Sequence, residues 1–183
     1  GGGGRDRGLF AEYGGDALAG AFDLRKLRIC AGHRVYGHES KCSNLHGHDY
    51  TFEFWVRPKY NLDSIGRVLD FSVVKKVMAE WLDENLDHAM ILFKDDPLVE
   101  WFKNKMVKCQ VLIEDDDCWQ CETVESPFFG QKHYVLSLNP TAENLCNVLA
   151  HKAQELLRGY DIAVTKVGCW ETPNCYAEYI LQE

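Results

Sequence analysis

Residues 46–56, HGHDYTFEFWV, carry the clearest structural signal in the chain. Every second position holds a histidine, an aromatic or an aliphatic side chain: His46, His48, Tyr50, Phe52, Phe54 and Val56. Successive side chains of a β-strand point to opposite faces of its sheet. The pattern therefore predicts a strand with one buried face, and the two histidines lie at the start of that face.

A similar alternation comes earlier, in FDLRKLRICAGH at residues 22–33. One face carries Leu27, Ile29, Ala31 and His33, and the other carries Lys26 and Arg28. A short polar loop joins this stretch to residues 46–56, so we expect the two to form an antiparallel pair of strands. In both strands, histidines therefore extend the row of side chains that faces the core.

Three histidines on converging faces favour a metal site: His33, His46 and His48. Two imidazoles that point the same way from one strand can reach a common atom, and the neighbouring strand can supply a third. Three histidines with an open fourth position are typical of catalytic zinc, whereas structural zinc usually has four ligands. Each histidine alone is more simply a polar residue at a strand start or a hydrogen-bonded core histidine. For the three together we infer zinc.

The overall composition limits the class of protein. A chain of 183 residues, 46% of them hydrophobic, fits one domain, which we place at residues 21–183 after a loose arm or tag remnant at residues 1–20. The net charge of −8 argues against a nucleic-acid partner, since such proteins carry basic patches. The sequence contains no signal segment or membrane-spanning run, so we expect a cytoplasmic protein whose eight cysteines are free thiols.

The remaining periodicities predict two long helices. DFSVVKKVMAEWLDENL begins with Asp70 as a helix cap, and NPTAENLCNVLAHKAQELL has Thr141 as a plausible N-cap. A short helix is expected at residues 97–104. Two final strands, DIAVTKVGCWE and CYAEYIL, are joined by a turn.

Between the long helices, the strand-like runs MVKCQVLI and HYVLSL flank an acidic stretch. They predict a long hairpin inserted at about residues 107–135. Cys118 and Cys121 in this stretch are more simply a pair of thiols at a hairpin tip than part of a small zinc site with Cys109 and His133.

Several other polar residues could take part in chemistry. Cys42 lies in the loop before the histidine strand, and residue patterns leave it open as a fourth metal ligand, an inert thiol or a general base. Asp87 next to His88 could orient an imidazole that moves protons, although such pairs are usually polar helix ends. Glu171 could hold a flat heterocycle by two hydrogen bonds, or it is an ordinary residue at a strand end.

Six motifs in order identify a likeness to a known family: AGH (31–33), CSNLHGH (42–48), GRVLDF (66–71), LDH (86–88), PTAEN (140–144) and WETPNCYAEY (170–179). Together they resemble the 6-pyruvoyl-tetrahydropterin synthase superfamily, from about Phe22 to Leu181. The likeness is greatest to its 6-carboxy-5,6,7,8-tetrahydropterin synthase group, which acts in queuosine (7-deazaguanine) biosynthesis. Three residues separate Cys42 from His46, as in that group.

The resemblance implies an α+β tunnelling fold (T-fold): a four-stranded antiparallel sheet with two helices on one face, in ββααββ order. It implies a homo-oligomer, either a trimer or a homohexamer built as a dimer of trimers, with sites between subunits. It also implies a zinc-dependent lyase. Zinc would lie on His33, His46 and His48, with Cys42 as the base and His88, oriented by Asp87, as its relay partner.

The substrate implied by the resemblance is a small pterin triphosphate. Glu171 would anchor the pterin and join the relay, and Thr141 and Glu143 would line its pocket. The expected reaction converts 7,8-dihydroneopterin triphosphate to 6-carboxytetrahydropterin, acetaldehyde and triphosphate. The alternatives are a 6-pyruvoyl-tetrahydropterin synthase, which keeps the three-carbon side chain, and a non-catalytic zinc and pterin-binding module.

Overall fold

A computed structural model describes residues 23–60, 62–67, 71–105, 108–110, 118–120 and 125–182. The expected arm at residues 1–20, the helix cap Asp70, the acidic run Glu114–Asp117 and Cys121 lie outside the described residues. The chain divides into two compact units, of which the first holds residues up to 28, 51–80 and 145–183 and the second holds residues 29–50 and 81–144. Two strands run through both units: β1 (Asp23–His33) and β2 (His46–Pro58).

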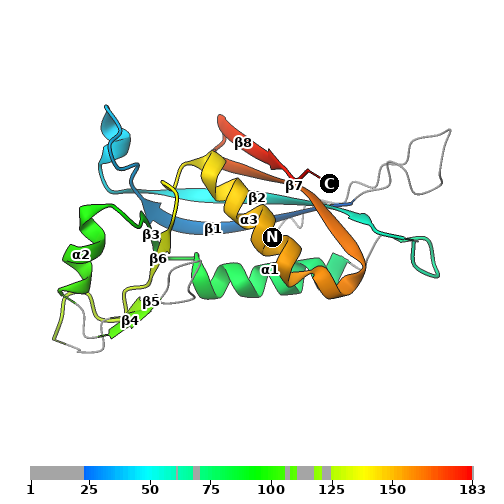
Figure 1. Ribbon diagram of the computed structural model, residues 1–183, viewed down its shortest axis with the longest axis horizontal. Coiled ribbons are helices and arrows are strands. Elements are labelled where there is room, and N and C mark those ends of the chain that lie inside the picture. Colours follow the sequence, from blue (N-terminus) through cyan, green and yellow to red (C-terminus); the bar gives the residue numbers. More distant parts are fainter. Residues whose placement is uncertain are drawn as a thin grey trace. The chain divides into compact units, whose positions relative to one another are not determined.

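The sheet of the first unit has the strand order β1-β2-β7-β8 (Figure 1). β7 (Ile162–Thr172) pairs antiparallel with β2, from Thr51 opposite Trp170 to Pro58 opposite Ile162. β8 (Cys175–Ile180) returns antiparallel along β7 after a tight turn. This confirms the predicted final pair of strands.

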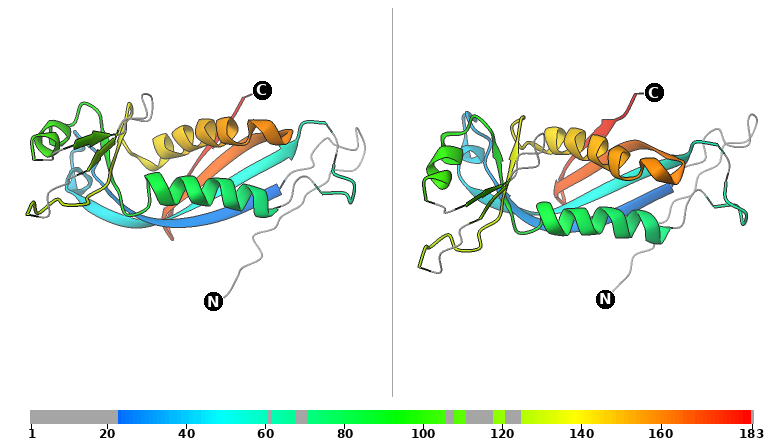
Figure 2. Two further views of the ribbon diagram at one scale, coloured as in Figure 1. Left: turned by 90° about the horizontal axis from the view of Figure 1, so that it is seen from below. Right: turned by 60° about the horizontal axis from the view of Figure 1, so that its bottom comes forward.

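Two long helices cover one face of this sheet in the first unit, where α1 (Phe71–Asn85) and α3 (Ala142–Leu156) lie side by side (Figure 2). The core between helices and sheet includes the buried side chains Phe52, Phe54, Val56, Val74, Met78, Leu145, Leu149, Val164 and Val167. The alternating residues of β2 therefore face the core as predicted. Burying each large apolar side chain contributes about 1.5–3 kcal/mol to folding.

The second unit departs from the predicted topology. β3 (Met90–Phe93) pairs parallel with the end of β1, and β6 (His133–Leu136) pairs parallel with β3, which gives the strand order β6-β3-β1-β2. The prediction of four antiparallel strands is therefore wrong for the described residues, because β3 and β6 add two parallel strands. β3 is only four residues long and shows no alternation that identifies a strand from sequence. β6 lies in the predicted strand-like run HYVLSL, but it pairs with β3 and not within a hairpin.

The segment between α1 and α3 is not the predicted hairpin. The run at residues 106–113 was expected to pair with HYVLSL, but β4 (Lys108–Gln110) pairs with β5 (Cys118–Gln120), and β6 pairs with β3. The expected short helix is confirmed as α2 (Pro97–Lys103). Its side chains Val99 and Phe102 form a small core with Leu92 and Val135. Together these elements replace the simple ββααββ order.

Two short 3₁₀ helices complete the described elements: η1 (Lys41–Ser43) before β2 and η2 (Arg158–Tyr160) before β7. Among the described residues, no helix is long and apolar enough to span a membrane.

Candidate metal centre and active site

The three predicted metal ligands lie together in the second unit. His33 ends β1, while His46 and His48 begin β2. Their ligand nitrogens all lie within 4.8 Å of one another, and this is the group among the described residues that could hold a metal ion. His33 is buried and the other two are half-buried. Strand alternation thus brings together three imidazoles from two strands, as the sequence predicted.

Hydrogen bonds fix which nitrogen of two histidines carries the proton. His33 Nδ1 donates to the carbonyl oxygen of Pro140 at 2.7 Å, and His46 Nδ1 donates to that of Asn44 at 2.6 Å. A carbonyl oxygen only accepts, so each neutral ring has its proton on Nδ1 and a lone pair on Nε2. Ring nitrogens of metal-binding histidines are commonly oriented in this way.

The two Nε2 atoms of His33 and His46 lie 3.0 Å apart. Two lone pairs at this distance repel unless a cation lies between them. Ligand nitrogens on a tetrahedral zinc ion, with Zn–N bonds of about 2.0–2.1 Å, are separated by roughly 3.4 Å. The observed spacing therefore fits a metal ion that is bound by Nε2 of both residues, and His48 completes a three-nitrogen donor set that suits zinc.

The surroundings of His33 and His48 lower their pKa values and favour the neutral rings. Burial, together with the neighbouring charges of His46 and His48, lowers the pKa of His33 to about 4. The hydrogen bond to Pro140 opposes this shift without overcoming it. Burial also lowers the pKa of His48. Neutral imidazole is the form that binds metal, so at neutral pH these rings have lone pairs available to a cation.

Asp87 and His88 are held against the backbone of β1. Asp87 Oδ1 lies 3.0 Å from His88 Nδ1 and also accepts a hydrogen bond from the backbone nitrogen of Cys30 at 2.9 Å. The backbone nitrogen of His88 donates to the Cys30 carbonyl, and His88 has a left-handed backbone with φ of 60°. The His88 side chain is 79% exposed. Its Nδ1 faces Asp87, which leaves Nε2 available to a ligand.

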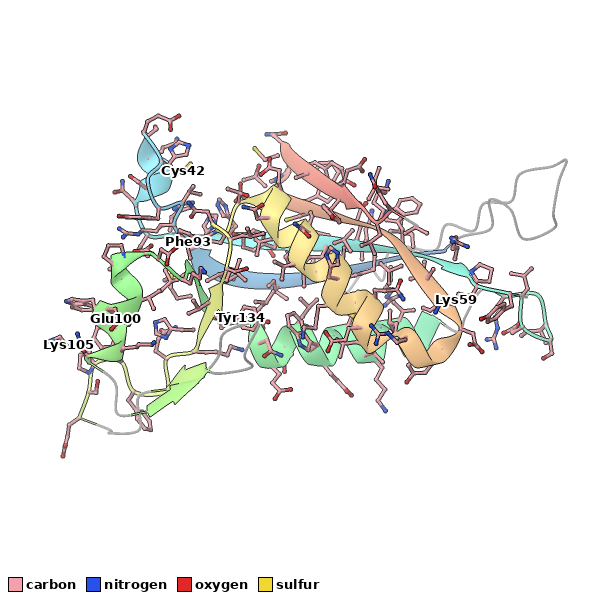
Figure 3. The ribbon with its side chains drawn as sticks, viewed as in Figure 1. Cys42, Lys59, Phe93, Glu100, Lys105 and Tyr134 are labelled. Atoms are coloured by element: carbon pink, nitrogen blue, oxygen red, sulfur yellow. The ribbon has the colours of Figure 1, made fainter. Side chains whose placement is uncertain are left out.

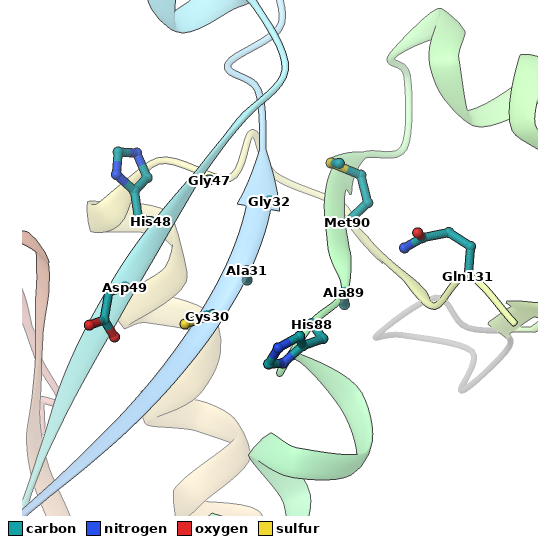
Figure 4. Close-up of a pocket in the computed structure, with 10 residues that line it drawn as sticks. All are labelled: Cys30, Ala31, Gly32, Gly47, His48, Asp49, His88, Ala89, Met90 and Gln131. Atoms are coloured by element: carbon teal, nitrogen blue, oxygen red, sulfur yellow. The ribbon is translucent and has the colours of Figure 1, made fainter.

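An open cavity of about 410 Å³ is lined by one of the three metal ligands and by His88 (Figure 4). Both His48 and His88 line it, together with Cys30, Ala31, Gly32, Gly47, Asp49, Ala89, Met90 and Gln131. Sequence reasoning missed Cys30, Asp49 and Gln131 as site residues. Cys30 and Asp49 are on the strands that carry the ligands, which is a usable signal, whereas Gln131 lies beside them only through the unpredicted β3 and β6 pairing.

Cys42 lies in η1 and is half-buried (Figure 3). Its carbonyl accepts a hydrogen bond from the backbone nitrogen of Val35, which fixes the loop between β1 and β2. Cys42 does not line the cavity that contains His88. A single chain therefore does not bring the expected base and its relay partner into that cavity.

The residues expected to bind substrate lie on different elements. Thr141 Oγ1 accepts a hydrogen bond from the backbone nitrogen of Asn144, which confirms it as the N-cap of α3, and Glu143 is exposed in the first turn. Glu171 is half-buried in the first unit, where the register between β7 and β8 shifts as in a β-bulge. Bulges commonly re-aim a side chain near functional sites.

Two basic residues, Arg34 and Lys41, lie between His33 and His46. The Arg34 guanidinium group makes two hydrogen bonds to the buried carboxylate of Asp96, the N-cap of α2. Lys41 is exposed. Arg34 therefore joins the end of β1 to α2.

Comparison with known proteins assigns the chain to a family. The family model described as 6-pyruvoyl tetrahydropterin synthase matches residues 24–181. The chain belongs to this family. Among curated members, 6-carboxy-5,6,7,8-tetrahydropterin synthase of Rickettsia felis is 36% identical over 84% of this chain and 96% of its own length. A probable enzyme of the same name from Halobacterium salinarum is 33% identical over 81% of this chain and 79% of its own.

Solved structures of other proteins share the fold. An uncharacterized protein from Wolinella succinogenes has a TM-score of 0.69 at 22% identity and covers 88% of this chain and 98% of its own. The 6-pyruvoyl tetrahydropterin synthase of Caenorhabditis elegans has a TM-score of 0.56 at 22% identity, over 88% of this chain and 96% of its own. The predicted tunnelling-fold class is confirmed at this level.

Proposed function

We propose that the chain is a zinc-dependent 6-carboxy-5,6,7,8-tetrahydropterin synthase, a lyase of queuosine (7-deazaguanine) biosynthesis. It would convert 7,8-dihydroneopterin triphosphate to 6-carboxytetrahydropterin, acetaldehyde and triphosphate. The observation that carries the proposal is the three-histidine group, of which His48 lines a cavity that His88 also lines. The curated relatives, 33–36% identical over most of the chain, support this choice of reaction.

His33, His46 and His48 would hold the zinc ion. When bound, zinc supplies Lewis acidity that polarises oxygen atoms of the substrate side chain. Burial lowers the pKa of His33 and of His48 and so favours their neutral forms. Hydrogen bonds to backbone carbonyls hold the rings of His33 and His46 in place.

The protons would be moved by Cys42 and His88. The Cys42 thiolate accepts a carbon-bound proton from the substrate side chain, and His88 transfers protons to and from its oxygens. Asp87 holds Nδ1 of His88, so the exposed Nε2 is the atom that exchanges protons with the substrate. Because Asp87 is itself held by the Cys30 backbone, the imidazole is oriented before substrate binds.

The pterin ring would be held by Glu171, whose carboxylate can accept two parallel N–H bonds from the ring edge. Thr141 and Glu143, at the start of α3, would line the pterin pocket. A site built to hydrogen-bond a ring edge rejects rings that lack those donors, because the carboxylate is then left unpaired.

The complete site would form between subunits of a homo-oligomer, a trimer or a homohexamer. The cavity of one chain contains His88 without Cys42, and this supports a neighbouring chain as the source of the thiol. Separation of the native protein by size, with light scattering, tests this part of the proposal. A monomer with full activity would contradict it.

Product analysis tests the reaction. The zinc-loaded protein is incubated with 7,8-dihydroneopterin triphosphate, and triphosphate, acetaldehyde and the pterin products are measured together. We expect acetaldehyde and triphosphate in equal amounts. Triphosphate without acetaldehyde, with the three-carbon side chain retained, would favour a 6-pyruvoyl-tetrahydropterin synthase. Zinc binding without triphosphate release would favour a non-catalytic pterin-binding module.

A further inference from the structure

Asn139 forms a reciprocal pair of hydrogen bonds with the backbone of Tyr36. Its Oδ1 accepts from the Tyr36 nitrogen at 3.0 Å, and its Nδ2 donates to the Tyr36 carbonyl at 2.8 Å. These are the two bonds that a neighbouring strand would make, here supplied by one side chain. A primary amide has the required donor and acceptor side by side. The two hydrogen bonds therefore hold the loop before α3 against the backbone of Tyr36, which follows His33 by three positions.

The backbone of Asn139 organises the start of that loop. Its carbonyl accepts hydrogen bonds from the backbone nitrogen of Thr141 at 2.8 Å and from the side-chain amide of Asn144 at 2.9 Å. Pro140, between them, has a φ angle restricted by its ring. Its buried carbonyl is the acceptor for His33 Nδ1 at 2.7 Å. The peptide group that contains this carbonyl also carries the Thr141 N–H that donates to Asn139, so this contact holds the orientation of the carbonyl.

We propose that Asn139 is a positioning residue for the metal centre. By holding the Pro140 carbonyl against His33, it selects the Nδ1–H form of that imidazole and leaves Nε2 as the metal ligand. A neutral imidazole without this acceptor would populate both forms. The inference about metal affinity rests on the metal role in the proposed function, whereas the inference about the protonated nitrogen concerns the metal-free chain alone.

The test compares Asn139→Ala with Asn174→Ala, a control in the exposed turn between β7 and β8. Nitrogen-15 NMR of histidine-labelled, metal-free protein reports which ring nitrogen of His33 carries the proton. We expect Nδ1 alone in the wild type and the control, and a mixture in Asn139→Ala. Competition with a chelator should show zinc affinity lowered 10-fold to 100-fold in Asn139→Ala and unchanged in the control, as is typical when a partner of a metal ligand is lost.

A merely structural role would lower the stability of Asn139→Ala but leave the spectrum of His33 and the zinc affinity of the folded protein unchanged. That result, with affinity within twofold of wild type, would overturn the inference. Should Asn139→Ala not fold, Asn139→Asp keeps the shape and the acceptor but loses the donor to Tyr36. A mixed spectrum in that variant supports the inference, and Nδ1–H alone contradicts it.

The two proposals fail in different ways. A wild-type protein that forms no acetaldehyde while His33 behaves as expected overturns the proposed reaction and leaves the role of Asn139 intact. Full acetaldehyde formation with an unaffected His33 in both Asn139 variants overturns only the role of Asn139.

Discussion

The Nε2 atoms of His33 and His46 face each other at 3.0 Å, while both Nδ1 atoms donate to backbone carbonyls. The backbone thus fixes two ligands with their lone pairs toward the same point. An arrangement of this kind costs free energy without a cation. We therefore expect metal binding to stabilise the fold by an amount that depends on metal concentration, because metal binds the folded state preferentially.

Substitution of Cys42 should separate catalysis from metal binding. Cys42→Ala should retain zinc and lose turnover by about 10²-fold to 10⁴-fold, the usual contribution of a general base. His48→Ala should lose both, because it removes a ligand. Zinc content by atomic spectroscopy and steady-state rates measure the two effects. Loss of zinc in Cys42→Ala would instead identify the thiol as a ligand.

Asp87→Asn should lower turnover without changing zinc affinity. The neutral amide no longer stabilises a charged His88 ring, whose Nδ1 lies 3.0 Å from Asp87 Oδ1 in the wild type. We expect kcat to fall by about 10²-fold, within the range for acid–base groups. Asp95→Asn, at an exposed position before α2, is the matched control. Equal rates in Asp87→Asn and Asp95→Asn would show that Asp87 takes no part in proton transfer by His88.

The metal-free protein should lose stability as pH falls from about 6.5 to about 4. Burial lowers the pKa of His33 and of His133 to about 4, below the value of 6.5 in an unfolded chain. Between these values the unfolded state binds more protons, so acid favours unfolding. At pH 5 each histidine should contribute a loss of about 2 kcal/mol relative to pH 7.

Urea unfolding of the metal-free protein at pH 7 and pH 5 measures this loss. His133→Leu should show a smaller difference than the wild type, because His133 no longer contributes while His33 and His48 still do. A variant with an unchanged difference would show that His133 does not titrate between these pH values. His133 is 1% exposed and packs against Phe102, with ring centroids 4.5 Å apart.

Gly32→Ala tests the packing beside the ligand His33. A Cβ atom at Gly32 would lie 2.8 Å from the terminal methyl group of Met90 and 3.2 Å from its sulfur. The Met90 side chain is flexible, so the substitution should cost about 1–2 kcal/mol and leave zinc binding intact. Met90→Ala in the same chain should relieve the clash, so the two changes should couple favourably in a double-mutant cycle of urea unfolding. Simple additivity would contradict this account.

The parts of the fold that follow from a local period could be predicted from sequence. His46, His48 and the core residues of β2 share one face because strand side chains alternate, and α1 and α3 follow the helical period. β6 lies in the predicted strand-like run HYVLSL, but its parallel pairing with β3 depends on distant segments and could not be predicted. β3 itself was missed, because a four-residue apolar run has no distinctive period. The hydrogen bonds of Asn139 to Tyr36 could not be predicted either, because the two residues are 103 positions apart in sequence.

X-ray absorption at the zinc edge of the zinc-loaded wild-type protein tests the central claim most directly, because it reports the donor atoms themselves. We predict a single bound zinc per chain, with histidine nitrogens at about 2.0–2.1 Å and no sulfur neighbour. His46→Ala should lose this signal, since it removes one of the two facing Nε2 atoms. A sulfur neighbour at about 2.3 Å, or zinc retained in His46→Ala, would contradict the three-histidine centre and its separate thiol base.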